Sequence, residues 1–383
     1  MKQVYFDNAA TTPIREEVAQ VVFDIMKSNF GNPSSSHAFG RSSRVLLEQS
    51  RKSIAKHLNV SAGEIIFTSG GTEADNLVLK SAVKDLGVSR IITSKIEHHA
   101  VLHTVEQLQE RFNVEVNYLE INAEGELDLI QLDNLLQNET RYTLVSLMHI
   151  NNEIGTILNL KQVADLCHSH NALFHTDAVQ SVGRYKLDLQ NVGVDFLAAS
   201  AHKFHGPKGV GFAYIKKNSR LRPMILGGEQ ERGLRAGTEN IHSIVGMEKA
   251  LDLAYQNLNS ESKYIKELKA YFIKQLERYI SNYKLNAASG NDEKSTYTMV
   301  NVQLPIPPEK SAMLLFQLDL KGIACSKGSA CQSGSSQKSH VLTEILNKEA
   351  LEKPSLRFSF SINNTREEVD YVVETLKTFI QTP

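Results

Sequence analysis

The alternation of short apolar runs with helical patterns, between about residues 60 and 215, constrains the fold of this chain more than any other feature. The strand candidates are 64–67, 90–93, 114–119, 142–148, 172–176, 195–199 and 210–215. Most of these runs are continuously apolar, which is typical of strands covered on both faces by crossover helices. The pattern therefore predicts an α/β fold with a large domain built on a seven-stranded, mostly parallel sheet.

The rhythm changes after about residue 250. A long amphipathic helix is predicted over 259–280, and strands are predicted over 298–304 and 356–361. Thr365 followed by Glu368 forms a capping box that predicts a final helix. At 383 residues the chain exceeds a single domain of about 150 residues. We predict a large domain over 16–250 and a smaller α+β domain over 251–383, joined by the N-terminal segment 1–15.

Composition excludes several classes of protein. Lys and Arg number 42 against 43 Asp and Glu, so no basic field attracts nucleic acid or an anionic membrane. No uncharged apolar run approaches the roughly 18 residues of a membrane-spanning helix, and the start lacks the apolar core of a signal peptide. Three cysteines cannot form a disulfide framework. We expect a soluble, cytoplasmic protein that binds neither nucleic acid directly nor a membrane.

Three segments that could bind a ligand or take part in catalysis follow predicted strands, and ligands bind at the carboxyl ends of strands in open α/β sheets. Gly70 and Gly71 precede a helix predicted to start near Thr72, and backbone N–H groups at a helix start suit a phosphate. A plain turn with Thr72 as the N-cap is the alternative. Asp177 directly follows a buried strand, so it either caps a helix or pairs with a bound cation.

Lys203 follows the apolar run 196–199 and precedes the strand 210–215. Most lysines are solvated surface charges, but a lysine at a strand end facing a cleft could carry a Schiff base. Lys203, Asp177 and the glycine turn together supply what pyridoxal phosphate needs: a lysine for its aldehyde, an acid for its ring nitrogen and a phosphate cup. A nicotinamide site is disfavoured because no G-x-G-x-x-G follows the first strand, and no P-loop is present.

Histidines follow another predicted strand. An imidazole of His98 or His99 could stack on a cofactor ring or relay protons. The spacing of His99 and His103, together with His98, is also compatible with a metal site. The cofactor interpretation is favoured, and no metal is expected.

Cys331 lies in the segment 326–339, where eight of fourteen residues are Ser or Gly. This composition predicts a mobile loop, in which a thiol near Lys327 can have a lowered pKa and act as a nucleophile. A small buried hydrophobe is the alternative, and it suits Cys325 and Cys167 better. Arg357 interrupts an apolar strand, so its charge must pair with an anion, either a substrate carboxylate or an internal acid.

These residues, in this order, resemble the cysteine desulfurases, pyridoxal phosphate enzymes of the class V aminotransferase group. The matching segments are 5–13, 31–35, 67–76, 97–98, 151–155, 175–181, 202–203, 235–238 and 328–331. The Ser-Ala-Cys sequence that ends at Cys331 resembles the NifS/IscS branch of the family. The resemblance implies the fold of type I pyridoxal phosphate enzymes.

The resemblance also implies roles toward the cofactor. Lys203 would hold its aldehyde, Asp177 would pair with its ring nitrogen, and His98 would stack on its ring. Gln180 and Asn152 would contact the ring oxygen or orient the substrate. The phosphate cup would consist of Gly71, Thr72, Ser200 and His202, completed by Thr238 from the other chain of a homodimer.

Toward the substrate, Arg357 and Asn152 would hold the carboxylate of L-cysteine, and Cys331 would take its sulfur as a persulfide, leaving alanine. The sulfur would pass to an acceptor protein such as an iron–sulfur scaffold. The IscS type usually docks that scaffold through a C-terminal extension, whereas this chain ends at Pro383 soon after its last predicted helix, which leaves the acceptor open. Cys325 could also form a regulatory disulfide.

Three other functions are compatible with parts of this pattern: a selenocysteine lyase, another class V aminotransferase-like enzyme, and a non-catalytic scaffold on an enzyme-derived fold. Cys331 favours sulfur transfer, because transamination needs no such thiol. Lys203 together with Asp177 argues against a non-catalytic scaffold.

Overall fold

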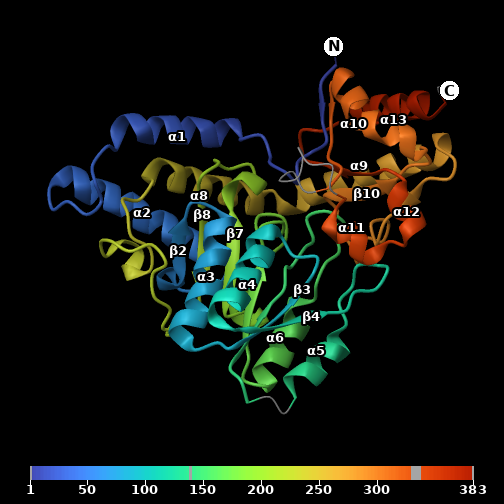
Figure 1. Cartoon of the computed structure of the whole chain (residues 1–383). Helices are drawn as coiled ribbons and strands as arrows, with labels where there is room; N and C mark the ends of the chain where they lie inside the picture. Colours follow the sequence, from blue (N-terminus) through green and yellow to red (C-terminus); the bar gives the residue numbers. More distant parts are fainter. Residues whose placement is uncertain (1, 138–139, 329–337, 382–383) are drawn as a thin grey trace.

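The computed structural model describes residues 2–137, 140–328 and 338–381, and a seven-stranded sheet forms the centre of its larger part (Figure 1). The strands in spatial order are β2 (Ile65–Thr68), β8 (Gly211–Ile215), β7 (Phe196–Ser200), β6 (Leu173–Asp177), β5 (Thr143–Ser146), β3 (Arg90–Ser94) and β4 (Glu115–Leu119). All neighbours are parallel except β8, which runs antiparallel to β2 and β7. The predicted seven-stranded, mostly parallel sheet is confirmed.

Helices cover both faces of this sheet. Successive strand residues point to opposite faces, so each strand contributes to two cores. In β7, Leu197 and Ala199 belong to one core, whereas Phe196 and Ala198 belong to the other. The helices in this part of the chain are α1 (Glu16–Ser28), α2 (Ala38–His57), α3 (Gly71–Leu86), α4 (His99–Phe112), α5 (Leu129–Leu136), α6 (Leu160–Ser169), α7 (Leu189–Val192) and α8 (Ile241–Gln256). The core on one face contains residues of α2, α6 and α8, and the core on the other face contains residues of α3 and α4.

A separate core, called the second core below, forms around a three-stranded antiparallel sheet in the order β12 (Ser355–Ser359), β10 (Met299–Gln303) and β9 (Lys284–Leu285). Its helices are α9 (Leu258–Tyr279), α10 (Pro308–Leu320), α11 (His340–Ile345), α12 (Lys348–Glu352) and α13 (Arg366–Gln381). The predicted capping box before α13 is confirmed: the Thr365 amide donates to Glu368 Oε2 at 3.0 Å, and the Glu368 amide donates to Thr365 Oγ1 at 3.3 Å. The domain boundary at residue 250 stays a prediction.

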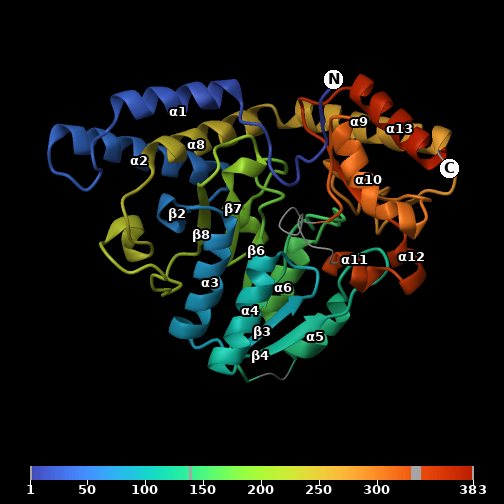
Figure 2. The ribbon, with the colours of Figure 1, turned by 45° about the horizontal axis from the view of Figure 1, so that its top comes forward.

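The N-terminal segment packs beside C-terminal elements, as both views of the ribbon show (Figure 2). Strand β1 (Val4–Tyr5) pairs in parallel with β11 (Ile323–Ala324). Phe6 lies in the second core, with its ring centroid 5.2 Å from that of Phe360. Among the described residues, no helix is both long and apolar enough to span a bilayer.

Candidate active site

A cavity of about 420 Å³ opens where the carboxyl ends of β6 and β7 face the start of α3. The predicted site residues that line it are Gly71, Thr72, His98, Asn152, Asp177, Gln180, Ser200, His202, Lys203 and Arg357. Thr238 does not line this cavity, and its side chain is exposed. Cys331 lies outside the described residues. The fold thus brings together side chains that are up to 286 positions apart in the sequence (from Gly71 to Arg357).

Lys203 and Asp177 reach the cavity from neighbouring strands. Asp177 ends β6, and Lys203 ends the short 3₁₀ turn Ala201–Lys203 that follows β7, the parallel neighbour of β6. The Lys203 Nζ donates to the carbonyls of Ala9 at 2.7 Å and Ala10 at 2.8 Å. Burial raises the pKa of Asp177, while a 2.9 Å hydrogen bond from the Val179 amide and the charge of Lys203 lower it. A basic and an acidic group therefore share one cavity.

The start of α3 lines the cavity together with Ser200 and His202. A Cβ on Gly71 would lie 2.5 Å from Val179 Cγ2. Only glycine therefore allows the start of α3 to approach Val179 this closely. The first turn of a 16-residue helix directs unpaired N–H groups and a positive dipole end at the cavity. Gly70, not Thr72, occupies the N-cap position, so the alternative in which Thr72 caps the helix is wrong.

Two histidines at the cavity are neutral at pH 7. The Nδ1 of His98 accepts a hydrogen bond from the Ala100 amide at 3.1 Å, which places the ring proton on Nε2. Burial, and next the charge of Lys203, lower the pKa of His98 to about 4. His202 contacts Thr11 Oγ1 through Nδ1 at 3.1 Å, and the same causes lower its pKa to about 4. Their neutrality leaves Lys203 as a cation among uncharged imidazoles.

The predicted metal alternative concerned His98, His99 and His103. The ring centroid of His99 lies 4.7 Å from that of His103 and 4.6 Å from that of His340, in a stacked and a tilted arrangement respectively. Within residues 2–137, 140–328 and 338–381, no group of three His, Cys, Asp or Glu side chains is arranged to hold a metal ion. These imidazoles pack against one another rather than converge on a point.

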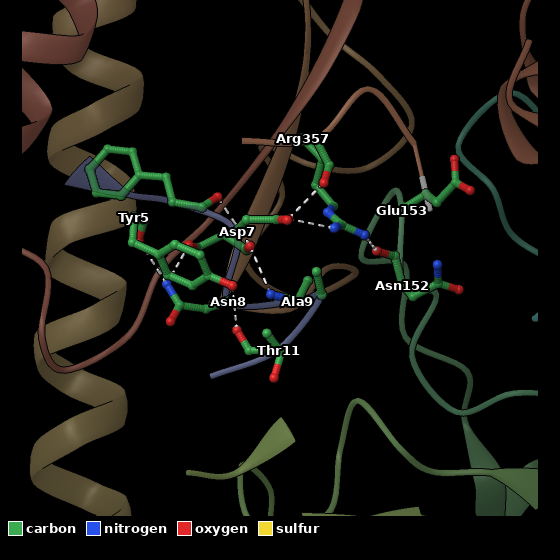
Figure 3. Close-up of polar contacts among 12 residues, drawn as sticks. Tyr5, Asp7, Asn8, Ala9, Thr11, Asn152, Glu153 and Arg357 are labelled. Carbon is green, nitrogen blue, oxygen red and sulfur yellow. Dashed lines mark hydrogen bonds and ion pairs between the residues drawn. The ribbon is translucent and has the colours of Figure 1, made fainter. Parts of the chain in front are cut away.

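Arg357 lies in the middle of β12 and is 1% exposed (Figure 3). Its Nη1 donates to the Asn152 carbonyl at 2.6 Å, and its Nη2 forms an ion pair with Asp7 Oδ1 at 2.7 Å. The Nε–H has no hydrogen-bond partner in the described part of the chain. The internal acid expected as one alternative is therefore Asp7, and the same guanidinium also lines the cavity.

Sequence reasoning missed Asp75 as a cavity residue. It lies one turn after Gly71 in α3, is 1% exposed, and has Oδ1 3.4 Å from the Nε2 of His175. Burial, and next the negative charge of Asp177, raise its pKa. The signal was available, because residues four apart on a helix share a face, so an acid at this spacing from Gly71 is directed at the same cavity.

Cys167 and Cys325 are free thiols, as predicted for residues of structural type. Cys167 is fully buried in α6, and Cys325 packs partly buried against the second core after β11. Burial raises the pKa of both thiols, so neither is activated as a thiolate.

The family model of class-V aminotransferases matches residues 4–372. The chain belongs to the class-V aminotransferase family. Among its curated members, this chain is 42% identical to the protein named cysteine desulfurase IscS of Dictyoglomus turgidum, an alignment that covers 99% of this chain and 95% of the relative. It is also 42% identical to the putative cysteine desulfurase IscS 1 of Bacillus subtilis, with 96% of each chain covered.

Solved structures of the family agree with the fold. A NifS-like protein superposes with a TM-score of 0.89 at 34% identity, covering 98% of this chain and 99% of the other. SspA in complex with cysteine superposes with a TM-score of 0.82 at 30% identity, covering 95% and 100% respectively. The sheet described above is thus that of fold type I pyridoxal phosphate enzymes.

Pyridoxal phosphate is the cofactor of this family, and the cavity fits it. Among the described residues, the side-chain carboxylate of Asp177 accepts one hydrogen bond only, so this buried group retains capacity for a protonated ring nitrogen. The close approach of Gly71 leaves the start of α3 open to an anion, as a phosphate requires. Lys203 supplies the one type of side chain that can bind the cofactor aldehyde.

Proposed function

We propose that this protein is a pyridoxal phosphate-dependent cysteine desulfurase, which converts L-cysteine to L-alanine and holds the sulfur as a persulfide on Cys331. The observation that carries the proposal is the convergence of Lys203, Asp177 and Arg357 on one cavity. A lysine and a buried acid serve the cofactor, and a buried guanidinium serves a carboxylate substrate. The names of the curated relatives support L-cysteine as that substrate.

Residues at the carboxyl ends of the large sheet and at the start of α3 would hold the cofactor, which when bound supplies an electron sink for bond breaking at the substrate α-carbon. Lys203 would bind it through Nζ and would afterwards move the substrate α-proton. Asp177 keeps a proton on the ring nitrogen, because its negative charge favours the cationic form of the partner. His98, a neutral imidazole with its proton on Nε2, packs on the ring and donates toward the substrate. Gly71, Thr72, Ser200 and His202 hold the phosphate.

The second core serves the substrate. The Nε–H of Arg357, which has no partner among the described residues, and the side chain of Asn152 orient the carboxylate of L-cysteine. The Cys331 thiolate attacks the substrate sulfur: a sulfur–sulfur bond forms as the carbon–sulfur bond breaks, and the carbon skeleton leaves as alanine after protonation. Arg357 thus fixes the substrate while another segment of the chain takes the sulfur.

We further propose a homodimer. Thr238 is exposed and does not line the cavity of its own chain, as expected of a residue that completes the phosphate site of a second copy. Phe30 and Phe39 add large exposed apolar rings near α1 and α2, at 74% and 60% exposure. Such apolar surface is typical of a surface covered by a partner. We propose that the enzyme works in the cytoplasm and passes its sulfur to an acceptor protein, such as an iron–sulfur scaffold.

The proposal is tested by incubating the purified, pyridoxal phosphate-loaded protein with L-cysteine and a thiol reductant. We expect alanine and sulfide in equal amounts, and faster turnover when a suitable acceptor protein is added. L-selenocysteine assayed in parallel measures substrate preference, and Lys203→Ala serves as the inactive control. Loaded protein that forms no alanine from L-cysteine would contradict the proposal.

A further inference from the structure

Arg184 is a buried arginine that lies behind the cavity rather than on its wall. Its side chain is 9% exposed and does not line the cavity that holds Lys203 and Asp177. It follows Gln180 by four residues in the turn after β6. A buried charge is costly unless its donors are satisfied, so the position of each acceptor shows what the guanidinium holds in place.

The guanidinium bridges Lys203, to which the proposed function gives direct contact with the cofactor, and Gln180, which the family resemblance places at the ring oxygen or the substrate. Its Nη1 donates to Gln180 Oε1 at 2.9 Å, and its Nη2 donates to the backbone carbonyl of Lys203 at 2.9 Å. Longer bonds, each 3.4 Å, reach Thr298 Oγ1 and the Asn8 carbonyl. One rigid planar group therefore connects the Gln180 side chain to the turn that carries Lys203.

The contact with Gln180 fixes the polarity of its amide. A guanidinium can only donate, so the Gln180 atom that faces Arg184 must be the oxygen. The amide nitrogen is then directed the other way, and it donates to the Ala9 carbonyl, a cavity-lining group, at 2.9 Å. Lys203 Nζ donates to the same carbonyl at 2.7 Å. The cavity side of Gln180 thus offers a hydrogen-bond donor, never an acceptor.

Among the described residues, no acid neutralises the charge of Arg184. Its side-chain acceptors among the described residues are an amide, a hydroxyl and two backbone carbonyls. A cation hydrogen-bonded only to neutral dipoles polarises them, and here it strengthens the Gln180 amide as a donor. A cofactor ring oxygen, which carries negative charge, is stabilised by such a donor and repelled by an amide oxygen.

We propose that Arg184 is a positioning residue that locks the Gln180 amide with its donor toward the cofactor ring oxygen and ties that amide to the Lys203 turn. The inference rests on the proposed function, because it assumes that pyridoxal phosphate binds in the cavity. The inference adds Arg184, which contacts neither cofactor nor substrate, to the residues that the proposed function assigns.

The test is a pH titration of the visible absorption band of the cofactor-loaded protein, without substrate. Loss of a donor and of a nearby positive charge favours the protonated chromophore, so Arg184→Met should move the midpoint to higher pH, by about half a unit or more. Arg184→Lys keeps the charge but cannot reproduce both arms of the fork, so it should give a smaller shift in the same direction.

A double-mutant cycle separates positioning from a general structural effect. If Arg184 acts through the Gln180 amide, the shift caused by Arg184→Met should fall to less than half in the Gln180→Ala background. If the Arg184→Met variant does not fold, Arg184→Lys takes its place in the double-mutant cycle. An equal shift in both backgrounds, or no shift in either Arg184 variant, would overturn the inference.

Arg90→Met is the matched control. Arg90 is 2% exposed and donates to Asn117 Oδ1 at 2.7 Å and the Leu135 carbonyl at 2.8 Å, with Glu115 Oε1 4.0 Å from its Nε. It begins β3, at the end of that strand away from the cavity. This variant should lose thermal stability without moving the titration. Protein that binds no pyridoxal phosphate would refute the proposed function and this inference together, whereas an unmoved titration refutes the inference alone.

Discussion

The cavity has two walls of different construction. The sheet wall, formed by Asp177, Lys203, His98 and His202, lies at the carboxyl ends of strands of the mostly parallel sheet. The arginine wall, formed by Arg357 and Asn152, joins β12 of the second core to the segment after β5. The sheet wall holds an acid with one hydrogen bond and two neutral imidazoles, whereas Arg357 is already paired with Asp7.

This difference separates two functions. A buried acid with spare acceptor capacity gains a partner when a cationic ring binds, so the sheet wall suits a resident cofactor. The Asp7 ion pair and the Asn152 carbonyl hold the guanidinium of Arg357 rigidly and leave Nε for a transient carboxylate. Losing a residue of the sheet wall should therefore abolish chemistry, while altering the arginine wall should mainly weaken substrate binding.

The largest effect is expected for Lys203→Ala. Without Nζ the cofactor has no covalent attachment and the α-proton no base, so turnover should fall by roughly 10²–10⁴-fold or more. The characteristic visible absorption should disappear while the fold is retained. Lys208→Ala is the control, because Lys208 also lines the cavity. If that variant loses the absorption band and Lys203→Ala keeps it, Lys208 carries the cofactor.

Arg357→Lys should raise KM for L-cysteine by roughly 10-fold or more with a smaller change in kcat, because an ammonium cannot hold Asp7 and the Asn152 carbonyl and at the same time donate from the position of Nε to a carboxylate. Cofactor content and the visible spectrum should not change. Asp7→Asn keeps the guanidinium and removes only its partner's charge, so it should raise KM less. If Arg357→Lys loses its cofactor, Arg357 serves cofactor binding rather than substrate binding.

The sheet wall should also carry pH-dependent stability. The folded-state pKa of His98 is about 4 and its ordinary value is 6.5, so the unfolded chain binds more protons between these values. Its contribution is present above pH 6.5 and is lost as pH falls toward 4, by at most about 3 kcal/mol.

Urea unfolding of the cofactor-free protein at pH 6.5 and pH 4.5 measures this loss. His98→Gln should lose less free energy of unfolding on acidification than the unmodified protein, whereas Arg357→Lys should lose as much. Equal losses in all three proteins would mean that His98 is not the proton-linked group.

The smallest effects are expected for the two cysteines away from the walls. Cys325→Ser and Cys167→Ser should each keep most of the turnover, because both thiols pack against cores. Cys167→Ser places a hydroxyl in a fully buried position and should cost about 1–3 kcal/mol of stability. Alanine production and thermal unfolding at equal cofactor loading check both variants. A Cys325→Ser variant without activity would mean that the nucleophile was wrongly chosen.

The sequence predicts the sheet wall more fully than the arginine wall. Continuous apolar runs identify buried parallel strands, and the residues that follow them, Asp177 and Lys203, necessarily meet at one sheet edge. The partner of Arg357 follows from no local pattern, since Asp7 lies 350 positions away and meets it only through tertiary packing. Likewise, no local sequence pattern distinguishes Arg184 from an ordinary arginine on the protein surface.

The sequence also did not predict which residue caps the helix α3 beside the sheet wall. The N-cap of α3 is Gly70 because Thr72 already lies in the helix, and only the dihedral angles of the turn decide between them. The four-residue spacing between Gly71 and Asp75 predicts that both lie on one face of the helix. It does not predict that this face borders the cavity, which depends on how the helix packs.

Sulfur transfer to Cys331 can be observed directly by peptide mass mapping. The cofactor-loaded protein is incubated with L-cysteine without reductant or acceptor, blocked with an alkylating reagent, and digested. We expect one additional sulfur atom on the peptide that contains Cys331, alanine in matching amount, and neither product in Cys331→Ser. Additional sulfur on the Cys325 or Cys167 peptide instead, or alanine formed at the full rate by Cys331→Ser, would contradict the account.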